Sequence, residues 1–270
     1  MLLILTLWAW IVLMAKPGTY RKEYPKGGHG YYMDGAKADG VTNIINKGTP
    51  KTGLINWAAG MAAEFAVDHP AAYVDLTRDE AVDLIAGAHN RNRDAAARRG
   101  TEVHRIAQRL MAGEEVEVDD VIEGHVDSYI KFCEDWQPGA DTLIERTVVN
   151  RKHGYMGTWD AVGTLRGMPG PGLYDIKTTR SGIFGDIALQ LAAYRYATSM
   201  LDGRLEVDMP EIHWCAALWV RADGYDLIPV TAGPDEFRAF LYVQQVAKFY
   251  DRCNDLVGGS LYPDEVEESA

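Results

Sequence analysis

The hydrophobic pattern changes from helical to β near residue 142, and this change restricts the fold more than any other feature. Before it, apolar residues recur every three or four positions, as in amphipathic helices. After it come short runs of branched and aromatic residues, separated by turns rich in glycine and proline, which are typical of strands. Two further helical stretches follow among these strands. This order excludes an all-helical bundle and an all-β sandwich, and it predicts one α/β domain.

The predicted core has the order helix, three strands, helix, strand. We expect a mixed central sheet flanked by helices, with helical additions at the N-terminal and C-terminal ends. The predicted helices cover residues 54–65, 79–89, 91–111, a segment ending at Trp136 with Val126, Tyr129, Ile130 and Phe132 inward, 186–201 and 234–257. The predicted strands cover residues 41–45, 142–150, 155–164, 173–177, 212–220 and 225–230.

The chain divides into an apolar segment over 1–15, an arm with helices over 16–90, the main domain over 91–257 and an acidic tail over 258–270. The apolar segment is shorter than the roughly 20 residues that a membrane-spanning helix needs, and no basic residue precedes it. Three interpretations stay open: translation that starts at Met14, a short signal anchor, or a buried hydrophobic segment. We expect no membrane partner and a cytoplasmic protein, in the host cytoplasm if the source is viral.

Composition excludes several classes of protein. With 47% hydrophobic residues the chain can bury a large core, so it is not a disordered protein. A net charge of -12 argues against a protein that coats nucleic acid through its overall charge. Cys133, Cys215 and Cys253 are odd in number and far apart, which predicts free thiols in a reducing compartment rather than a disulfide framework.

Acidic and basic residues on two predicted strands form the first candidate site. Side chains alternate along a strand, so Asp175 and Lys177 share one face. Asp160, on the preceding strand, can reach that face if the two strands pair. Two carboxylates suit a hard divalent cation, and a lysine beside it can hold a water molecule. Such a site fits hydrolysis of a phosphodiester.

Two predicted helices add further polar groups. His104 follows Gly100 by one turn, so another backbone or a substrate can approach closely there. Gln190 and Tyr194 are four residues apart and share one face of the helix that follows the Asp175 strand. An amide and a phenol at this spacing can orient a phosphate or a water molecule. The other six histidines lack a motif partner.

These four motifs, Gly100-x-x-x-His104, Gly157-x-x-Asp160, Asp175-x-Lys177 and Gln190-x-x-x-Tyr194, stand in an order that resembles the PD-(D/E)xK nuclease superfamily. The similarity is to its RecB-like branch, which includes stand-alone phage and CRISPR-associated exonucleases, and it covers residues 95–220. The resemblance implies a restriction-endonuclease-like core. It also implies that His104, Asp160, Asp175 and the Ile176 carbonyl bind Mg²⁺ or Mn²⁺. Asp160, Asp175, Lys177, Gln190 and Tyr194 would then be the catalytic residues.

The chain departs from the family that it resembles in three respects. Asp175 stands where the family more often has glutamate, which has a longer side chain. Some CRISPR-associated relatives hold an iron–sulfur cluster on four cysteines, whereas this chain has 3, so we expect no cluster. The chain also lacks a phosphate loop of the type GxxxxGK[ST], so we expect neither ATP binding nor a helicase motor.

Basic residues gather in one part of the acidic chain. Residues 91–109 hold six arginines and two acidic residues, and we predict that Arg91, Arg98, Arg99 and Arg105 bind the DNA backbone. The alternative is that the arginines pair with the acidic run over 114–123. Trp57, Trp136 and Trp159 are interpreted as core residues, with base stacking as the alternative.

The main hypothesis is a Mg²⁺- or Mn²⁺-dependent DNA nuclease, most simply an exonuclease of recombination, repair or degradation. Its expected partners are linear single- or double-stranded DNA and a recombination protein. Three alternatives stay open: a nuclease-fold binding or assembly subunit that is active only in a complex, a sequence-independent endonuclease, and a protein tethered to a membrane through residues 1–15.

Overall fold

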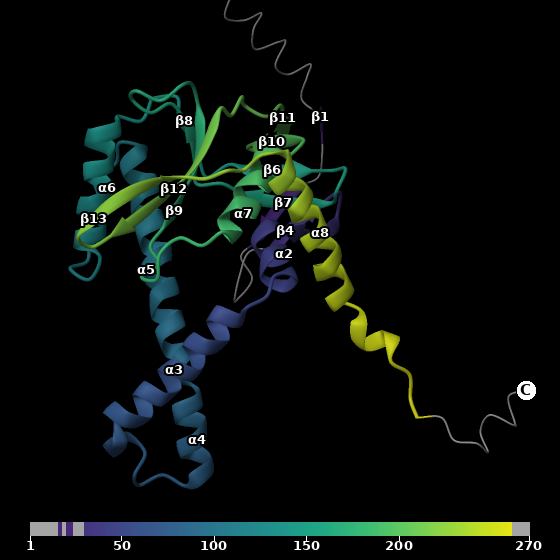
Figure 1. Cartoon of the computed structure of the whole chain (residues 1–270). Helices are drawn as coiled ribbons and strands as arrows, with labels where there is room; N and C mark the ends of the chain where they lie inside the picture. The colour runs from purple at the N-terminus through teal and green to yellow at the C-terminus, as the bar shows by residue number, and fades with distance from the viewer. Residues whose placement is uncertain (1–15, 18–19, 24–29, 261–270) are drawn as a thin grey trace, which may run out of the picture.

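A computed structural model describes residues 16–17, 20–23 and 30–260 of the chain. Helices flank two mixed β-sheets (Figure 1). The predicted α/β class is therefore confirmed, but the prediction of a single central sheet is wrong. The predicted segment 1–15 and the last ten residues of the predicted tail lie outside the described residues.

The smaller sheet holds two of the acidic motifs. Its strand order is β13-β12-β9-β8-β5, and β9 runs parallel to β12 while the other neighbours are antiparallel. The strands are β5 (Leu143–Ile144), β8 (Ala161–Gly163), β9 (Gly172–Lys177), β12 (Trp214–Arg221) and β13 (Gly224–Pro229).

The larger sheet has the order β1-β11-β10-β6-β7-β4-β3-β2, in which β4 and β7 are parallel. Its strands are β1 (Lys16–Pro17), β2 (Tyr20–Glu23), β3 (Gly30–Met33), β4 (Ala36–Gly40), β6 (Thr147–Asn150), β7 (Tyr155–Thr158), β10 (Ser199–Asp202) and β11 (Leu205–Val207). Six of these strands, β1 to β4, β10 and β11, lie outside the predicted set. The arm over 16–90 thus adds strands to a sheet of the main domain.

Two sheets form because one hairpin is broken in both of its strands. The predicted strand over 142–150 is divided into β5 and β6, and the predicted strand over 155–164 into β7 and β8. At the break, the Glu145 N–H donates to the Asp160 carbonyl at 2.9 Å and the Trp159 N–H donates to the Arg146 carbonyl at 3.2 Å. The hairpin therefore stays paired while it passes from one sheet to the other.

The helices cover both sides of the sheets. On one side α2, α7 and α8 pack together over a core that includes Tyr155, Trp159 and Phe240. On the other side α6 packs on β12 and β13 and against α5, over a core that includes Phe132 and Tyr174. The main helices are α2 (Val41–Gly48), α3 (Thr52–Asp68), α4 (Arg78–Ala86), α5 (Ala88–Met111), α6 (Glu123–Trp136), α7 (Asp186–Arg195) and α8 (Pro234–Tyr250).

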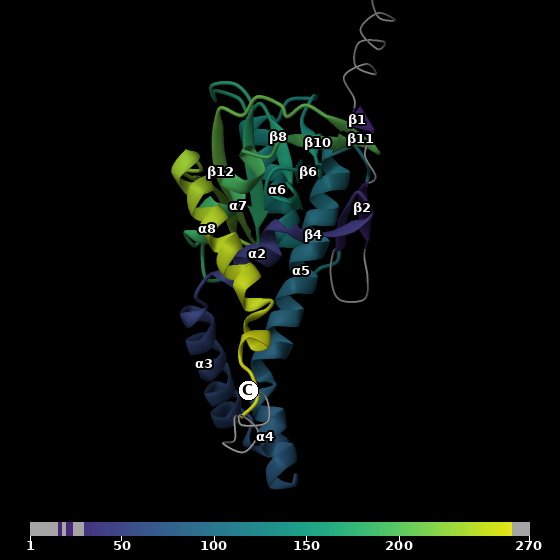
Figure 2. The same ribbon diagram turned by 90° about the vertical axis from the view of Figure 1, so that its right-hand side faces the viewer.

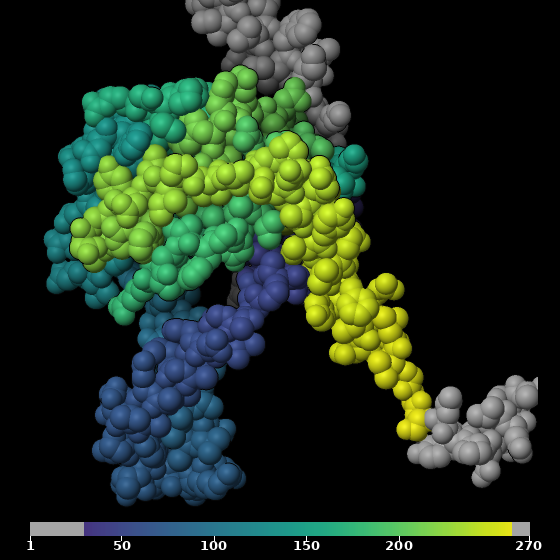
Figure 3. Space-filling model, viewed as in Figure 1, coloured from purple at the N-terminus to yellow at the C-terminus, as the bar shows by residue number. Residues whose placement is uncertain are grey.

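A helical projection extends from this body. The helices α3, α4 and the first half of α5 point away from the two sheets (Figures 1 and 2), and the space-filling view shows them as a separate lobe (Figure 3). α3 packs against α5, yet none of its residues is buried. Arg91 of α5 lies over the ring of Phe65 in α3, 4.8 Å from its centroid, and links the two helices.

Several boundaries differ from the predicted ones. Residues 41–45 begin helix α2 instead of forming a strand, and Val41, Ile44 and Ile45 are buried at helical spacing. The helix predicted over 186–201 ends at Arg195, and the last one ends at Tyr250, before a short 3-10 turn. Ile130 is 39% exposed, so its predicted inward position is wrong.

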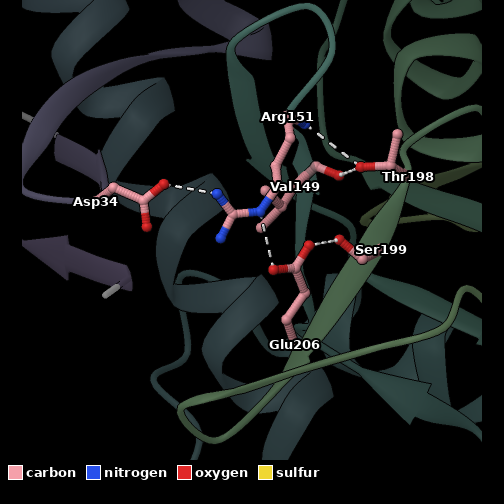
Figure 4. Close-up of polar contacts among 6 residues, drawn as sticks. All are labelled: Asp34, Val149, Arg151, Thr198, Ser199 and Glu206. Atoms are coloured by element: carbon pink, nitrogen blue, oxygen red, sulfur yellow. Dashed lines mark hydrogen bonds and ion pairs between the residues drawn. The ribbon is translucent and has the colours of Figure 1, made fainter. Parts of the chain in front are cut away.

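A partly exposed arginine joins three turns of the larger sheet through two ion pairs (Figure 4). Arg151, just after β6, donates to Asp34 at 2.6 Å and to Glu206 of β11 at 3.1 Å. The buried carboxylate of Glu206 also accepts a hydrogen bond from Ser199 of β10. The turn after β3, the turn after β6 and the β10–β11 hairpin are therefore held together by one arginine.

Among the described residues, every helix is too short or too polar to cross a bilayer.

Candidate active site

The two acidic motifs face each other across neighbouring strands. β8 and β9 are antiparallel with Ala161 opposite Tyr174, so one further step of this register sets Asp160 opposite Asp175. Asp160 Oδ2 accepts a hydrogen bond from the Ile176 N–H at 2.6 Å. Asp160 Oδ1 lies 3.3 Å from Nδ1 of His104, which α5 brings over the sheet. The structure therefore brings His104, Asp160 and the Ile176 backbone together.

A second set of contacts connects β9 with α7. Lys177 Nζ lies 2.5 Å from Oδ2 of Asp175, as expected for two side chains on one face of a strand. Gln190 accepts a hydrogen bond from Lys177 at 3.2 Å and donates to Asp175 Oδ1 at 2.9 Å. The same amide nitrogen lies 3.2 Å from the Tyr194 hydroxyl. All six predicted side chains of the site thus lie in one connected cluster.

The buried charges shift one another's ionisation. Burial, followed by the nearby Asp160 carboxylate, raises the pKa of Asp175. Burial also acts to raise the pKa of Asp160, but His104 and Lys177 hold it below its usual value. Burial would lower the pKa of His104, yet Asp160 and then Asp175 raise it to about 9. The site therefore sets two carboxylates against the imidazolium of His104 and the ammonium of Lys177.

Two motif glycines are explained by close approach. A Cβ atom on Gly157 would lie 2.5 Å from Cε1 of the buried Tyr194 ring, well inside van der Waals contact. A Cβ atom on Gly100 would lie 3.1 Å from the hydroxyl of Thr178, which follows Lys177. The glycines let α7 and α5 approach the strands that carry Asp160 and Lys177, so they belong to the construction of the site.

The donor atoms of the site fit a divalent cation. One ligand atom from each of His104, Glu145 and Asp160 lies within 4.8 Å of the other two. Carboxylate oxygens suit Mg²⁺ and Mn²⁺, and an imidazole nitrogen favours Mn²⁺ over Mg²⁺. The sequence analysis missed Glu145. The sequence did contain a signal for it. Glu145 is the acidic residue of the predicted strand over 142–150, and this strand precedes the one expected to carry Asp160.

The predicted DNA-binding arginines fall into two groups. Arg91 donates to the Leu84 carbonyl at 3.0 Å and lies over Phe65, and Arg105 contacts Glu102 through two nitrogens at 2.9 and 2.5 Å. Arg98 makes no ion pair with any described residue. Arg99 has a buried Nε atom without a hydrogen-bond partner in the described part of the chain. Arg98 and Arg99 are therefore the arginines with capacity left for a phosphate.

The structure also bears on the predictions for three other residues, Arg109, Trp159 and His125. Arg109 pairs with Glu114 at 2.7 Å, so one arginine does contact the acidic run. Trp159 is fully buried, which excludes base stacking by this residue. His125, left without a role by the sequence, has a buried Nδ1 atom that lacks a hydrogen-bond partner among the described residues. Arg99 and Arg180 act, after burial, to lower the pKa of His125.

Comparison with known proteins adds no relative to these observations. No family model matches the chain, and no curated protein matches it.

Proposed function

We propose that the chain is a Mg²⁺- or Mn²⁺-dependent deoxyribonuclease with a PD-(D/E)xK core of the RecB-like type, and that it acts as an exonuclease. The observation that carries this proposal is the cluster in which Lys177 contacts both Asp175 and Gln190, while Asp160 lies beside His104. An isolated strand-edge salt bridge would leave the positions of Gln190, Tyr194 and His104 unexplained. A site for phosphodiester hydrolysis accounts for all of them.

The side chains suit in-line attack by water on phosphorus. In that reaction a bond forms between the water oxygen and phosphorus, and a bond from phosphorus to a sugar oxygen breaks. A divalent cation held by the acidic residues would neutralise the charge that develops on the phosphate and acidify water. Burial acts to lower the pKa of Lys177, but Asp175 and Asp160 raise it overall, so the ammonium persists at neutral pH. It can therefore donate a hydrogen bond to the water or to a phosphate oxygen.

A groove beside the lysine supports access for a DNA strand. Lys177 and Gln190 line it together with Asn46, Ile183 and Phe184. Phe184 is exposed, so its ring is available to a base. Arg98 and Arg99 lie on α5, the helix that also carries His104. These residues offer phosphate and base contacts to a DNA strand.

The test is digestion of end-labelled DNA in the presence of Mn²⁺ or Mg²⁺. We expect cleavage of linear DNA that falls by about a hundredfold or more in Lys177→Ala and Asp175→Ala, because each change removes charge from the reacting centre. Lys152→Ala is the matched control, since Lys152 is exposed. Cleavage that persists unchanged in both site variants would contradict the proposal.

The form of the DNA separates the proposed activity from the alternatives. An exonuclease needs an end, so covalently closed circles should be spared while linear single or double strands are degraded. Cleavage of circles would indicate a sequence-independent endonuclease instead. Tight DNA binding without turnover would indicate a binding or assembly subunit that is active in a complex.

A further inference from the structure

Glu145 occupies a special position at the broken hairpin. It is the first of the two residues between β5 and β6, and its N–H donates to the Asp160 carbonyl at 2.9 Å. Glu145 and Asp160 are therefore backbone partners at the point where the hairpin leaves one sheet for the other. Their side chains, together with His104, bring donor atoms within 4.8 Å of one another.

We propose that Glu145 is a ligand of the divalent cation, which binds between His104, Glu145 and Asp160. This inference rests on the proposed function, and it adds a residue to the expected ligand set. The family resemblance assigns direct ligand roles to His104, Asp160 and Asp175 and none to Glu145. Oδ1 of Asp175 accepts a hydrogen bond from Gln190 at 2.9 Å, and its Oδ2 lies 2.5 Å from Lys177.

The geometry of the three donors agrees with a small cation. Ligands at about 2.1 Å in an octahedron lie about 3.0 Å apart when adjacent and about 4.2 Å apart when opposite. The donor atoms lie within 4.8 Å of one another, so rotations of the side chains can bring them to these separations. A nitrogen and two carboxylates form a mixed donor set, so the position is more than a patch of acidic residues.

Two separate clefts support a division between cation and lysine. His104, Glu145, Asp160 and Ile176 line one of them. Lys177 and Gln190 line the other, in which none of these four residues takes part. We therefore place the cation in the first cleft, and Lys177 in the second, where it lies 2.5 Å from Asp175.

The backbone at Glu145 allows a selective variant. Glu145 has φ of +50°, in the left-handed region that glycine adopts more readily than glutamate. Glu145→Gly therefore removes the carboxylate without creating backbone strain, whereas most substitutions would retain that strain. Glu145→Gln keeps the size of the side chain and removes its charge. Glu117→Gln makes the same chemical change at an exposed position and is the matched control.

The experiment is titration of the full chain with Mn²⁺ alone, followed by calorimetry and by the loss of the free Mn²⁺ signal in electron paramagnetic resonance. We expect Glu145→Gln and Glu145→Gly each to weaken Mn²⁺ binding by about tenfold or more, with Glu117→Gln equal to the unaltered chain. In the presence of a chelator, Glu145→Gly should melt at the same temperature as the unaltered chain or higher. That result would separate a lost ligand from lost folding.

Other outcomes overturn the inference in distinguishable ways. If both Glu145 variants bind Mn²⁺ like the unaltered chain while Asp160→Asn does not, Glu145 is not a ligand and the proposed nuclease function stands. If the unaltered chain fails to bind Mn²⁺ or Mg²⁺, both the ligand and the proposed function are overturned. Should Glu145→Gln fail to fold, the Glu145→Gly titration decides the question.

Discussion

The amide nitrogen of Gln190 donates a hydrogen bond to Oδ1 of Asp175 at 2.9 Å. The amide oxygen of Gln190 accepts from Lys177 at 3.2 Å, so one side chain sets the positions of both groups. A lysine that must reach a phosphate or water molecule depends on such support, because its four-carbon side chain is flexible.

Replacing Gln190 should therefore reduce turnover without removing the cation. We expect Gln190→Ala to lower kcat for DNA cleavage by about tenfold to a hundredfold, since the lysine is no longer held in place. Mn²⁺ affinity should change less than about threefold, because Gln190 contacts none of His104, Glu145 and Asp160 in the described contacts. Steady-state kinetics and calorimetry measure the two effects. Gln245→Ala, at an exposed position of α8, is the control, and an equal loss in that variant would contradict the prediction.

Gly157 is expected to be intolerant of even one extra methyl group. A Cβ atom would lie 2.5 Å from the buried ring of Tyr194, so Gly157→Ala must displace either α7 or its strand. We expect a loss of about 1–3 kcal/mol in the free energy of unfolding, as for other overpacked cores. Gly60→Ala is the control, because a Cβ atom at Gly60 meets nothing within 4 Å in helix α3. That variant should be neutral or more stable by about 0.5–1 kcal/mol. Urea unfolding of both variants tests the contrast, and equal stabilities would refute it.

The sequence could predict those parts of the site that lie within regular elements. Alternation along β9 indicated that Asp175 and Lys177 share a face, and the four-residue spacing in α7 paired Gln190 with Tyr194. The sequence analysis missed Glu145 because the strand is interrupted there. Glu145 itself has a left-handed backbone conformation, and the alternation of side chains does not continue through such a break. The side on which Glu145 lies depends on the path of the hairpin between two sheets.

The errors in the fold have similar physical causes. Val41, Ile44 and Ile45 are β-branched and were interpreted as a strand, yet their spacing of three and four matches the buried face of α2. Here tertiary packing outweighs β propensity. The segment after Arg195 continues the helical pattern in its apolar residues, but Gly203 and Arg204 form the two-residue turn of the β10–β11 hairpin. Gly203 has φ of +61°, and glycine at the first position of a two-residue turn is a recognised hairpin signal.

The pKa of His104 predicts how stability depends on pH without a cation. Asp160 and Asp175 outweigh burial and raise this pKa to about 9, from about 6.5 in the unfolded chain. The folded protein therefore holds the proton more tightly, and the resulting stability is complete below about pH 6.5 and lost as pH rises through about 9. In a chelator, the free energy of unfolding should fall by up to about 3 kcal/mol across this range.

A histidine variant isolates this contribution. In His104→Asn the free energy of unfolding should decline less between about pH 6.5 and 9 than in the unaltered chain. His213→Asn changes a more exposed histidine and should show the same decline as the unaltered chain. Urea titrations at several pH values measure the slope. A cation that binds His104 must displace its proton, so Mn²⁺ binding should release about one proton below pH 9. Identical slopes in the unaltered chain and His104→Asn would contradict the assignment.

The structure narrows the DNA-binding prediction to Arg98 and Arg99. Arg99 has a buried Nε atom without a hydrogen-bond partner among the described residues, and a phosphate oxygen could satisfy it. Arg99→Gln should weaken binding to all DNA sequences about equally and lower the slope of log affinity against log salt by about one. Arg105→Gln should have a smaller effect, since Glu102 already binds that guanidinium. Arg204→Gln, at an exposed hairpin turn, is the control for charge alone. Equal salt slopes for Arg99→Gln and Arg204→Gln would argue against a phosphate at Arg99.

The Arg151–Glu206 pair should contribute far more to stability than the exposed pairs. Glu206 is buried and lies 3.1 Å from Arg151, so Arg151→Ala removes a counter-charge from a carboxylate inside the larger sheet. We expect a loss of about 1–3 kcal/mol in the free energy of unfolding, since Arg151 itself is partly exposed. Arg238→Ala removes an exposed pair with Asp235 and should cost less than about 1 kcal/mol. Because Arg151 also binds Asp34, the turn after β3 should become more accessible to protease in Arg151→Ala. If Arg151→Ala has the same stability and the same protease cleavage pattern as Arg238→Ala, then other contacts hold the three turns together.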